Sequence, residues 1–443
     1  MRIKSSASRL SLLLGGLFFA VPAFSADLLQ VYREALGNDA QYAAARATLE
    51  AGREKAPQGR AGLLPTVSAT ANTTWNDNTY KPDSVASSSR SYNTNAYNLN
   101  LTQPLFRWQN YVQYGQAKLQ VVQAEAVFAQ ASQDLILRVA QAYFDVLNAQ
   151  ENLKAVRANK QSISQQLEQA KKNFEVGTAT ITDSQEAQSR FDLASAQEIA
   201  AQSDLDVKRY VLRLIVGKDS GELNKLKSQA VLQPPQPANM EQWVDAAVKD
   251  SFAVQAQQVA AEVAAKEIER TQAGHYPTLD VVANYGRSRS AQGYTSNQTT
   301  DVGNIGLQLN IPIYQGGLVN SKTREAVANR TAAEAALENA RRTASLGAQQ
   351  SFLGVVNGLA QVRALDAALI SSTSALESNK LGYEVGVRIN IDVLNAENQV
   401  YVTKRDLAKA RFDTLLAQLK LKAAVGALGE ADLEQINPLF EAP

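Results

Sequence analysis

The chain has 443 residues, of which 44 are basic and 43 acidic, and it contains one histidine and no cysteine. Its formal net charge of +1 at pH 7 excludes the strongly basic surface of nucleic-acid-binding proteins. The absence of cysteine excludes disulfides. A histidine-based zinc site needs several histidine ligands, and the chain has only His275. Composition therefore predicts a protein without a metal ion or other cofactor and without a nucleic-acid partner.

The first 25 residues have the pattern of a secretory signal peptide. Three basic residues in the first nine precede an apolar run over 10–21, and Ala-Phe-Ser at 23–25 forms a small-residue cleavage site. We predict that residues 1–25 take no part in the fold. No continuous apolar run of about 18 residues follows, so we expect no membrane-spanning helix, and any passage through a membrane to be made by strands.

A helix is predicted over 27–59, followed by a pair of strands. Apolar residues recur at helical spacings over this range, and Pro57 with the glycines after it ends the pattern. From Pro65 the period changes to two, which predicts a strand of about ten residues, a polar loop over 76–91 and a returning strand that ends at Pro104. One face of these strands carries Val67, Ala69, Ala71, Trp75, Tyr97, Leu99 and Leu101.

The second half of the chain repeats this order. A helix is predicted over 241–274, and a second strand pair over 277–312 surrounds a polar loop at 287–301. Strands with one apolar and one polar face are typical of a membrane barrel, and a half-buried soluble sheet has the same pattern. Aromatic residues near the strand ends favour the barrel. Four strands cannot close a barrel, so we expect three chains to supply twelve.

Two blocks of the chain, 105–233 and 313–437, contain no proline. Each is predicted to hold a very long helix, a tip and a shorter helix. The first long helix, over 106–174, would span roughly 100 Å at about 1.5 Å per residue. Valine and leucine recur every seven residues in the second block, which is typical of a coiled coil. Alanine occurs on several faces of these predicted helices, which suits helices with neighbours on both sides, as in the wall of a tube. The alternative is an ordinary antiparallel coiled-coil hairpin.

The two tips are near copies of each other. Residues 174–183 (FEVGTATITD) reappear as 383–392 (YEVGVRINID), an offset that also relates residues outside the tips. In each copy we expect the glycine to end one helix in the left-handed conformation and Asp183 or Asp392 to act as the N-cap of the next. The chain is therefore predicted to be a tandem duplication of a unit of about two hundred residues.

The duplication divides the chain into five parts. We predict a signal peptide (1–25), a first structural repeat (26–218), a linker in a mixed equatorial region (219–240), a second structural repeat (241–426) and a C-terminal tail (427–443). The first repeat includes the strand pair 65–104 and the tip 174–183, and the second the strand pair 277–312 and the tip 383–392.

Strand pairs bounded by prolines, very long helices and twin Val-Gly turns followed by an aspartate resemble the TolC-type outer-membrane efflux family. The resemblance covers essentially all of the chain after residue 25, in the same order. Its most specific pieces are IPIYQGG at 311–317 and the segment from Tyr383 to Ala396, followed by Tyr401 and Ala-Val-Gly at 424–426.

The resemblance implies a mainly α fold with a small β part. Three chains would form an outer-membrane β-barrel with four strands per chain, which continues into a long periplasmic α-helical barrel of coiled-coil helices. The implied function is a passive export duct of a tripartite efflux pump or type I secretion system, and not an enzyme. The implied partners are a homotrimer, outer-membrane lipid, a periplasmic adaptor protein and an inner-membrane pump of ABC or RND type.

The same resemblance assigns roles to the two tips. Residues of the constriction that would close the periplasmic end are Thr182, Asp183, Tyr383, Arg388 and Asp392. Residues at the tips that would contact the adaptor are Val176, Gly177, Thr178, Val385, Gly386 and Val387. Taken without the family, both aspartates are ordinary helix caps, and Arg388 is a solvated charge in a turn.

The sequence departs from the family pattern at Asn395, where well-known members carry a second aspartate three residues after the one that matches Asp392. One acidic ring instead of two is expected to weaken cation selectivity and block by polyvalent cations. The alternative function that we consider is a trimeric structural or adhesive surface protein, which long stalks would suit.

Overall fold

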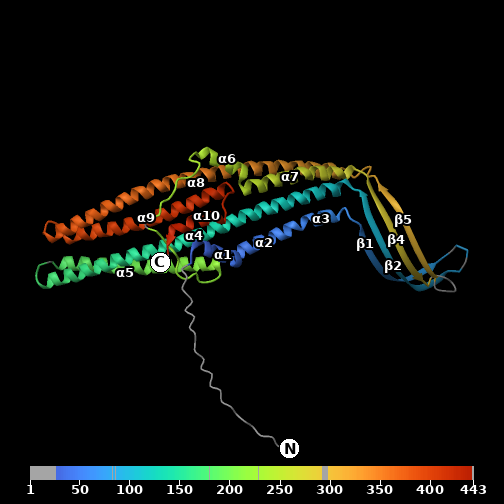
Figure 1. Ribbon diagram of the computed structural model, residues 1–443. Helices are drawn as coiled ribbons and strands as arrows, with labels where there is room; N and C mark the ends of the chain where they lie inside the picture. Colours follow the sequence, from blue (N-terminus) through green and yellow to red (C-terminus); the bar gives the residue numbers. More distant parts are fainter. Residues whose placement is uncertain are drawn as a thin grey trace, which may run out of the picture.

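The computed structural model describes residues 26–441, apart from 82, 85, 179, 228 and 292–297. The predicted signal peptide, residues 1–25, and the last two residues of the predicted tail lie outside the described residues. The protein is strongly elongated, with a β-sheet at one end, two helical tips at the other and a group of short helices about halfway along (Figure 1). These short helices and the chain termini form what we call the middle belt.

The first repeat builds one wall of long helices. Helix α4 runs for 68 residues, pairs with α5 and is flanked nearer the sheet by three short helices. The bounds are α1 Leu28–Asn38, α2 Ala40–Arg53, α3 Lys55–Ala61, α4 Trp108–Glu175 and α5 Ile181–Val216. The single helix predicted over 27–59 is broken, because Asp39 leaves the helical conformation and its carboxylate caps α2 by accepting from the amide of Tyr42.

The second repeat has the same order of elements. Helix α8 runs for 67 residues and pairs with α9, while α6 and α7 take the place of the short helices of the first repeat. The bounds are α6 Met240–Asp250, α7 Phe252–Gln272, η1 Ala273–His275, α8 Leu318–Glu384, α9 Asn390–Ala424, α10 Glu430–Ile436 and η2 Asn437–Leu439. In the linker, the short strand β3 (Lys225–Leu226) pairs with β6 (Phe440–Glu441), which ties the linker to the C-terminal tail.

The four long strands form one antiparallel sheet in the order β1-β2-β4-β5. Their bounds are β1 Thr66–Tyr80, β2 Ser88–Phe106, β4 Thr278–Ser290 and β5 Gln298–Asn310. Strands β2 and β4, about 190 residues apart in sequence, pair directly and join the two repeats. Within the described residues, neither β1 nor β5 has a partner strand on its outer side, so the sheet has two open edges.

Both ends of the polar loops predicted over 76–91 and 287–301 are strand, so the predicted loops were too long; residues 82, 85 and 292–297 lie outside the described residues. Cross-strand polar contacts extend the ladders: the Ser91 hydroxyl donates to Asp77 at 2.8 Å, and the Asn78 amide donates to the Tyr92 hydroxyl at 3.0 Å. In the second pair, Arg287 donates twice to Asp301. Polar side chains look like a loop in sequence, but they stabilise a strand when each finds a partner opposite.

The apolar core lies in the middle belt. Tyr143 and Phe144 of α4 pack against Phe440 of the tail, and Phe144 stacks on Phe412 of α9 with ring centroids 5.8 Å apart. The buried Tyr143 hydroxyl donates to the carbonyls of Ala26 and Asn224. This cluster holds the start of the described chain, the linker and the tail onto the long helices.

The seven-residue repeat of α9 forms a buried seam against its neighbours, as expected for a coiled coil, with Val393, Val400 and Leu407 each at most 6% exposed. The expectation that no helix is apolar enough to cross a membrane was too strong, since an 18-residue window of α8 reaches a mean hydropathy of 1.3. That helix is rich in alanine and pairs with α9 and α7, so composition alone does not place it in a membrane.

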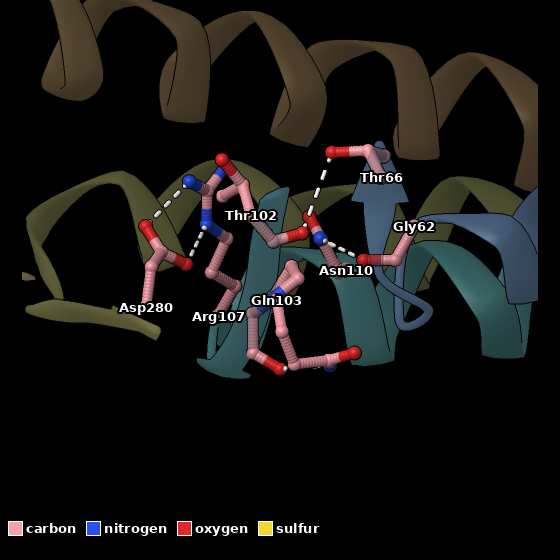
Figure 2. Close-up of polar contacts among 8 residues, drawn as sticks. Gly62, Thr66, Thr102, Gln103, Arg107, Asn110 and Asp280 are labelled. Carbon is pink, nitrogen blue, oxygen red and sulfur yellow. Dashed lines mark hydrogen bonds and ion pairs between the residues drawn. The ribbon is translucent and has the colours of Figure 1, made fainter. Parts of the chain in front are cut away.

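An ion pair joins the two repeats where the sheet meets the helices. Figure 2 shows the Arg107 guanidinium facing Asp280, with which it forms two hydrogen bonds of 2.8 and 2.6 Å. Arg107 precedes α4, whereas Asp280 lies in β4 and is 6% exposed. The Gln103 amide also donates to the Leu63 carbonyl, so strand β2 is held on both sides at this junction.

We expect Arg107→Ala to lower the apparent free energy of unfolding by about 3 kcal/mol, because it leaves the buried Asp280 carboxylate without a partner. Thermal unfolding of the purified protein in mild detergent measures the effect. The matched control is Arg330→Ala, which removes an exposed ion pair within α8 that is worth less than about 0.5 kcal/mol. Equal losses in the two variants would contradict the role assigned to Arg107.

Candidate functional site

Both helical tips end in the same turn. The amide of Thr178 donates to the carbonyl of Asn173 and the amide of Gly177 to that of Phe174, which is a Schellman motif. In the second tip Val387 and Gly386 donate to the matching carbonyls, and both glycines have φ of 78°. The predicted left-handed glycines are confirmed, and each glycine allows the chain to reverse without the steric cost of a Cβ.

In the first tip the predicted N-cap was wrong. The cap of α5 is Thr180, whose hydroxyl accepts from the amide of Asp183, while the Asp183 carboxylate accepts from the amide and the hydroxyl of Thr180 at 3.0 and 2.8 Å. Asp183 is thus the third helical residue of a capping box. The Thr182 hydroxyl lies 3.0 Å from that of Thr180, so this network includes both constriction residues predicted in this tip.

The capping box also sets the charge of the first tip. Accepting hydrogen bonds from the Thr180 amide and hydroxyl lowers the pKa of the Asp183 carboxyl below its ordinary value of 3.8. The stabilisation is therefore complete above about pH 4 and is lost as the pH falls through the lower value of the folded protein. Asp183 is accordingly a carboxylate throughout the neutral range.

The second tip is capped differently, and Asp392 is not its N-cap. Helix α9 starts after Ile389, which has no side-chain acceptor, and Asp392 again occupies the third helical position. There its carboxylate lies 3.6 Å from Nη1 of Arg388, and the Arg388 amide donates to the carbonyl of Gly382. The structure thus brings together two of the predicted constriction residues of this tip, Arg388 and Asp392.

Tyr383, the third predicted constriction residue of this tip, is half-buried in the last turn of α8. Among the described residues of the single chain, no hydrogen bond joins it to Arg388 or Asp392. Asn395 does have a partner in the other hairpin, because Nη1 of Arg190 in α5 donates to its side-chain oxygen at 3.3 Å. Nη2 of the same guanidinium lies 3.4 Å from Glu186. The position where the family pattern has a second aspartate therefore carries an amide next to a cation.

A buried carboxylate near the tips was missed by the sequence analysis. Glu397 of α9 is 7% exposed and accepts from the Ser162 hydroxyl and from the Gln166 side chain of α4 at 3.1 Å. Its other oxygen lies 3.8 Å from Nζ of Lys380 in α8. Glu397 thus holds three helices from both repeats together. Only its position on the buried side of the heptad pattern, four residues after Val393, could have indicated it.

The tip residues predicted to contact a partner lie at the far end of both hairpins (Figure 1). Val176, Val385 and Val387 are each at least two-thirds exposed, which is unusual for valine, while Gly177, Gly386 and Thr178 form the backbone turns between them. No group of three or more potential metal ligands occurs in the described part of the chain. The site therefore consists of a polar network and an apolar tip, and it contains no catalytic constellation.

The fold is defined by an open, two-faced sheet at one end and by coiled-coil helices of about 100 Å that lead away from it. The chain matches the family described as outer membrane efflux protein over residues 31–218 and 243–427. It therefore belongs to the outer membrane efflux protein family. The two matched segments confirm the tandem duplication.

Two curated relatives match nearly the whole chain. It is 33% identical over 427 residues to the outer membrane protein TolC of Vibrio cholerae, which covers 96% of this chain and 95% of the relative. It is 32% identical over 429 residues to the alkaline protease secretion protein AprF of Pseudomonas aeruginosa, with 94% and 88% covered. Their names place one relative in the outer membrane and connect the other with protease secretion.

Solved structures show the same fold. The outer membrane channel CmeC of Campylobacter jejuni superimposes with a TM-score of 0.80 at 16% identity and covers 99% of this chain and 97% of its own. The outer membrane protein VceC of Vibrio cholerae gives 0.77 at 21% identity, with 90% and 96% covered. The mainly α fold with a small sheet is confirmed.

These comparisons confirm the expected class and location. The protein is an export channel of the outer membrane that extends into the periplasm, and its family is one of channel proteins and not of enzymes. The adhesive alternative receives no support from them.

We expect Glu397→Ala to loosen the tips, because it removes the acceptor that Ser162, Gln166 and Lys380 share. Hydrogen exchange measured by mass spectrometry should become several-fold faster in the peptide that spans Tyr383 to Asn395, and Glu397→Gln should have a smaller effect, since one acceptor remains. Glu384→Ala, an exposed acid of the same tip, is the control. Equal exchange in Glu397→Ala and the control would contradict this role.

Proposed function

We propose that three copies of this chain form a duct through the outer membrane and the periplasm, as the outer part of a tripartite efflux pump or a type I secretion system. The observation that carries the trimer is the pair of open sheet edges. Backbone amides and carbonyls of β1 and β5 need partners inside a bilayer, and pairing β5 of one chain with β1 of the next satisfies both edges.

The polar face of the sheet would line the lumen of this barrel. Along β2 and β4 it carries Asn98, Asn100 and Asn284, and the Asn284 amide donates to the Asn100 side chain. The opposite face carries leucine, valine and tyrosine, as a lipid-facing surface requires. A lumen lined by neutral amides and hydroxyls favours a duct of low chemical selectivity, so the cargo would be chosen by the inner-membrane partner.

At the periplasmic end, the constriction would be formed by Thr182, Asp183, Tyr383, Arg388 and Asp392. The contrast between the two tips supports α8 and α9 as the moving pair. The first tip is held by a complete capping box, whereas the second depends on the exposed Arg388–Asp392 pair and on Glu397. Opening would separate α9 from α4 and break the contacts of Glu397.

The exposed valines of the tips would contact a periplasmic adaptor, which links the duct to an inner-membrane pump of ABC or RND type. Val387 is 76% exposed and Val176 is 73% exposed, and in both repeats they sit at the point farthest from the sheet. Apolar side chains in such a position indicate a surface that a partner covers. We also keep the division into repeats 26–218 and 241–426 as a proposal.

Photo-crosslinking in cells tests this function. A photoreactive residue at Val387 or Thr178 should capture a periplasmic adaptor when export is active, and mass spectrometry identifies the captured protein. The control position is Ile370, which is 72% exposed on α8 but lies about 25 Å from the tip, and it should capture less adaptor. Capture of neighbouring copies of this chain alone, at both tip positions, would exclude the docked duct.

We expect Asn395→Asp to strengthen block of the channel by a polyvalent cation. The change places a carboxylate beside Asp392 in each chain, next to Arg190, and three chains would present six carboxylates around one axis. Single-channel recording in planar bilayers with hexaamminecobalt measures the block, which should appear at a concentration several-fold lower than for the unchanged channel. Arg190→Gln with Asn395→Asp should strengthen it further. Unchanged block in both variants would show that position 395 does not face the conducting path.

A further inference from the structure

The apolar face of the sheet, which we call the outward face, becomes polar along the strands, and two arginines of β4 lie at this change. The strand register aligns its side chains in rows across all four strands. Beginning nearer the helices, these rows are Val67, Leu101, Ala283 and Ile305; Ala69, Leu99, Tyr285 and Gly303; Ala71, Tyr97, Arg287 and Asp301; and Thr73, Asn95, Arg289 and Thr299. The first two rows are apolar, and each of the next two carries one arginine.

A groove lies where the apolar rows meet the row of Arg287. It has a volume of about 290 Å³, and its outward-facing lining consists of Ala69, Ala71, Tyr97, Leu99, Tyr285 and Arg287. The small alanines of β1 leave room beside the larger rings and leucine of the neighbouring strands. Arg287 is the only charged member of the lining. The groove thus combines an apolar trough with a cation at the end that is farther from the helices.

The height of the two arginines can be estimated from the strand geometry. Arg289 lies ten residues along β4 from Leu279, the first apolar residue of the outward face. At about 3.3 Å per residue and a strand tilt of about 40°, the height is about 25 Å, equal to the apolar band of a membrane barrel. Arg287, two residues earlier, would lie just inside this band, and Arg289 at its outer limit.

The two arginines also differ in their ion-pair partners, and the arginine that would lie deeper in the bilayer is the one with an acidic partner. Arg287, which would lie in lipid, is neutralised by a two-point ion pair with Asp301. Arg289 is exposed and forms no ion pair with any residue that the structure describes. The other acid of the outward face nearby, Asp77, lies two rows farther out on β1, where Ser91 donates to it. Arg289 is therefore a cation at the membrane interface that needs an anionic partner.

We propose that the outward face binds lipid A, the phosphorylated and multiply acylated glucosamine disaccharide of the outer leaflet. One acyl chain occupies the groove beside Tyr97 and Tyr285, and Arg289 binds a phosphate. This inference rests on the proposed barrel, in which the apolar face meets lipid. It goes beyond that proposal because it names a lipid and the residues that bind it.

The position and chemistry of the Arg289 row favour lipid A over a diacyl glycerophospholipid. The sheet and the helical tips are at opposite ends of the molecule (Figure 1). In the proposed duct the tips lie in the periplasm, so the end of the sheet farther from the helices would lie in the outer leaflet. The row of Arg289 also contains Thr73, Asn95 and Thr299, whose hydroxyl and amide groups suit the hydroxyls of a sugar. A diacyl glycerophospholipid such as phosphatidylglycerol has one phosphate and a smaller polar surface, and it would leave most of this row without a partner.

The test is a lipid titration of the full-length protein, purified in mild detergent and stripped of lipid, with native mass spectrometry as the readout. The probe is bis-phosphorylated lipid A. Arg289→Gln should weaken its binding about tenfold, and Arg289→Lys, which keeps the charge, should retain most of it. The control is Arg90→Gln, which removes a charge from β2 in the same sheet but on the opposite, polar face, and should bind as the unchanged protein does.

Binding of chemically altered lipids by the unchanged protein tests the proposal even if Arg289→Gln does not fold. The unchanged protein should bind dephosphorylated lipid A and phosphatidylglycerol at least several-fold more weakly than bis-phosphorylated lipid A, and millimolar inorganic phosphate should not compete. Equal binding of phosphatidylglycerol, competition by phosphate, or equal binding by Arg289→Gln would overturn the proposal. Conductance of the same proteins in planar bilayers is a separate readout. Loss of lipid A binding with normal conductance would contradict the lipid proposal and leave the proposed duct unaffected. Absence of conductance would contradict the duct, and the lipid titration would still report on binding.

Discussion

The proposed duct depends on one constraint: a four-stranded sheet placed in lipid cannot leave its edge amides and carbonyls without partners. Inside the chain the duplication solves half of this problem, because β2 of the first repeat pairs with β4 of the second. The Arg107–Asp280 ion pair stabilises that contact where the strands become helices. The remaining edges, β1 and β5, are the physical reason for the assembly that we propose. In that proposal each chain is one section of a wall, because only its neighbours complete the sheet.

The long helices, like the sheet, are incompletely covered within one chain. Helices α4 and α8 are too long to have a globular core along their whole length, and the large apolar cluster is confined to the middle belt. Beyond the belt, small side chains allow close helix contacts, and much of α8 is exposed in the single chain. The belt therefore acts as the rigid centre from which the two hairpins extend to the tips.

At the tips the two repeats have diverged, and this difference supports the gating that we propose. Both use the same glycine turn, but only the first follows it with a capping box, through Thr180 and Asp183. The second replaces threonine by Ile389 at the cap and adds Arg388, whose guanidinium lies near Asp392. A stable tip and a weakly held tip in one chain suit a device in which one hairpin moves against the other.

The sequence by itself determined the features that depend on neighbouring residues: the long proline-free helices, the alternation of the strands, the left-handed Gly177 and Gly386, and the duplication. The resemblance of the tip also pointed to Arg388 and Asp392, which the structure places 3.6 Å apart and whose role in a constriction is a proposal. Only the tertiary structure decided that the polar segments around Asp77 and Arg287 are strand, that Thr180 and not Asp183 is the cap, and that Glu397 is buried between helices of both repeats. The reason is physical, since a polar side chain is read locally as exposed until a partner from a distant segment satisfies it.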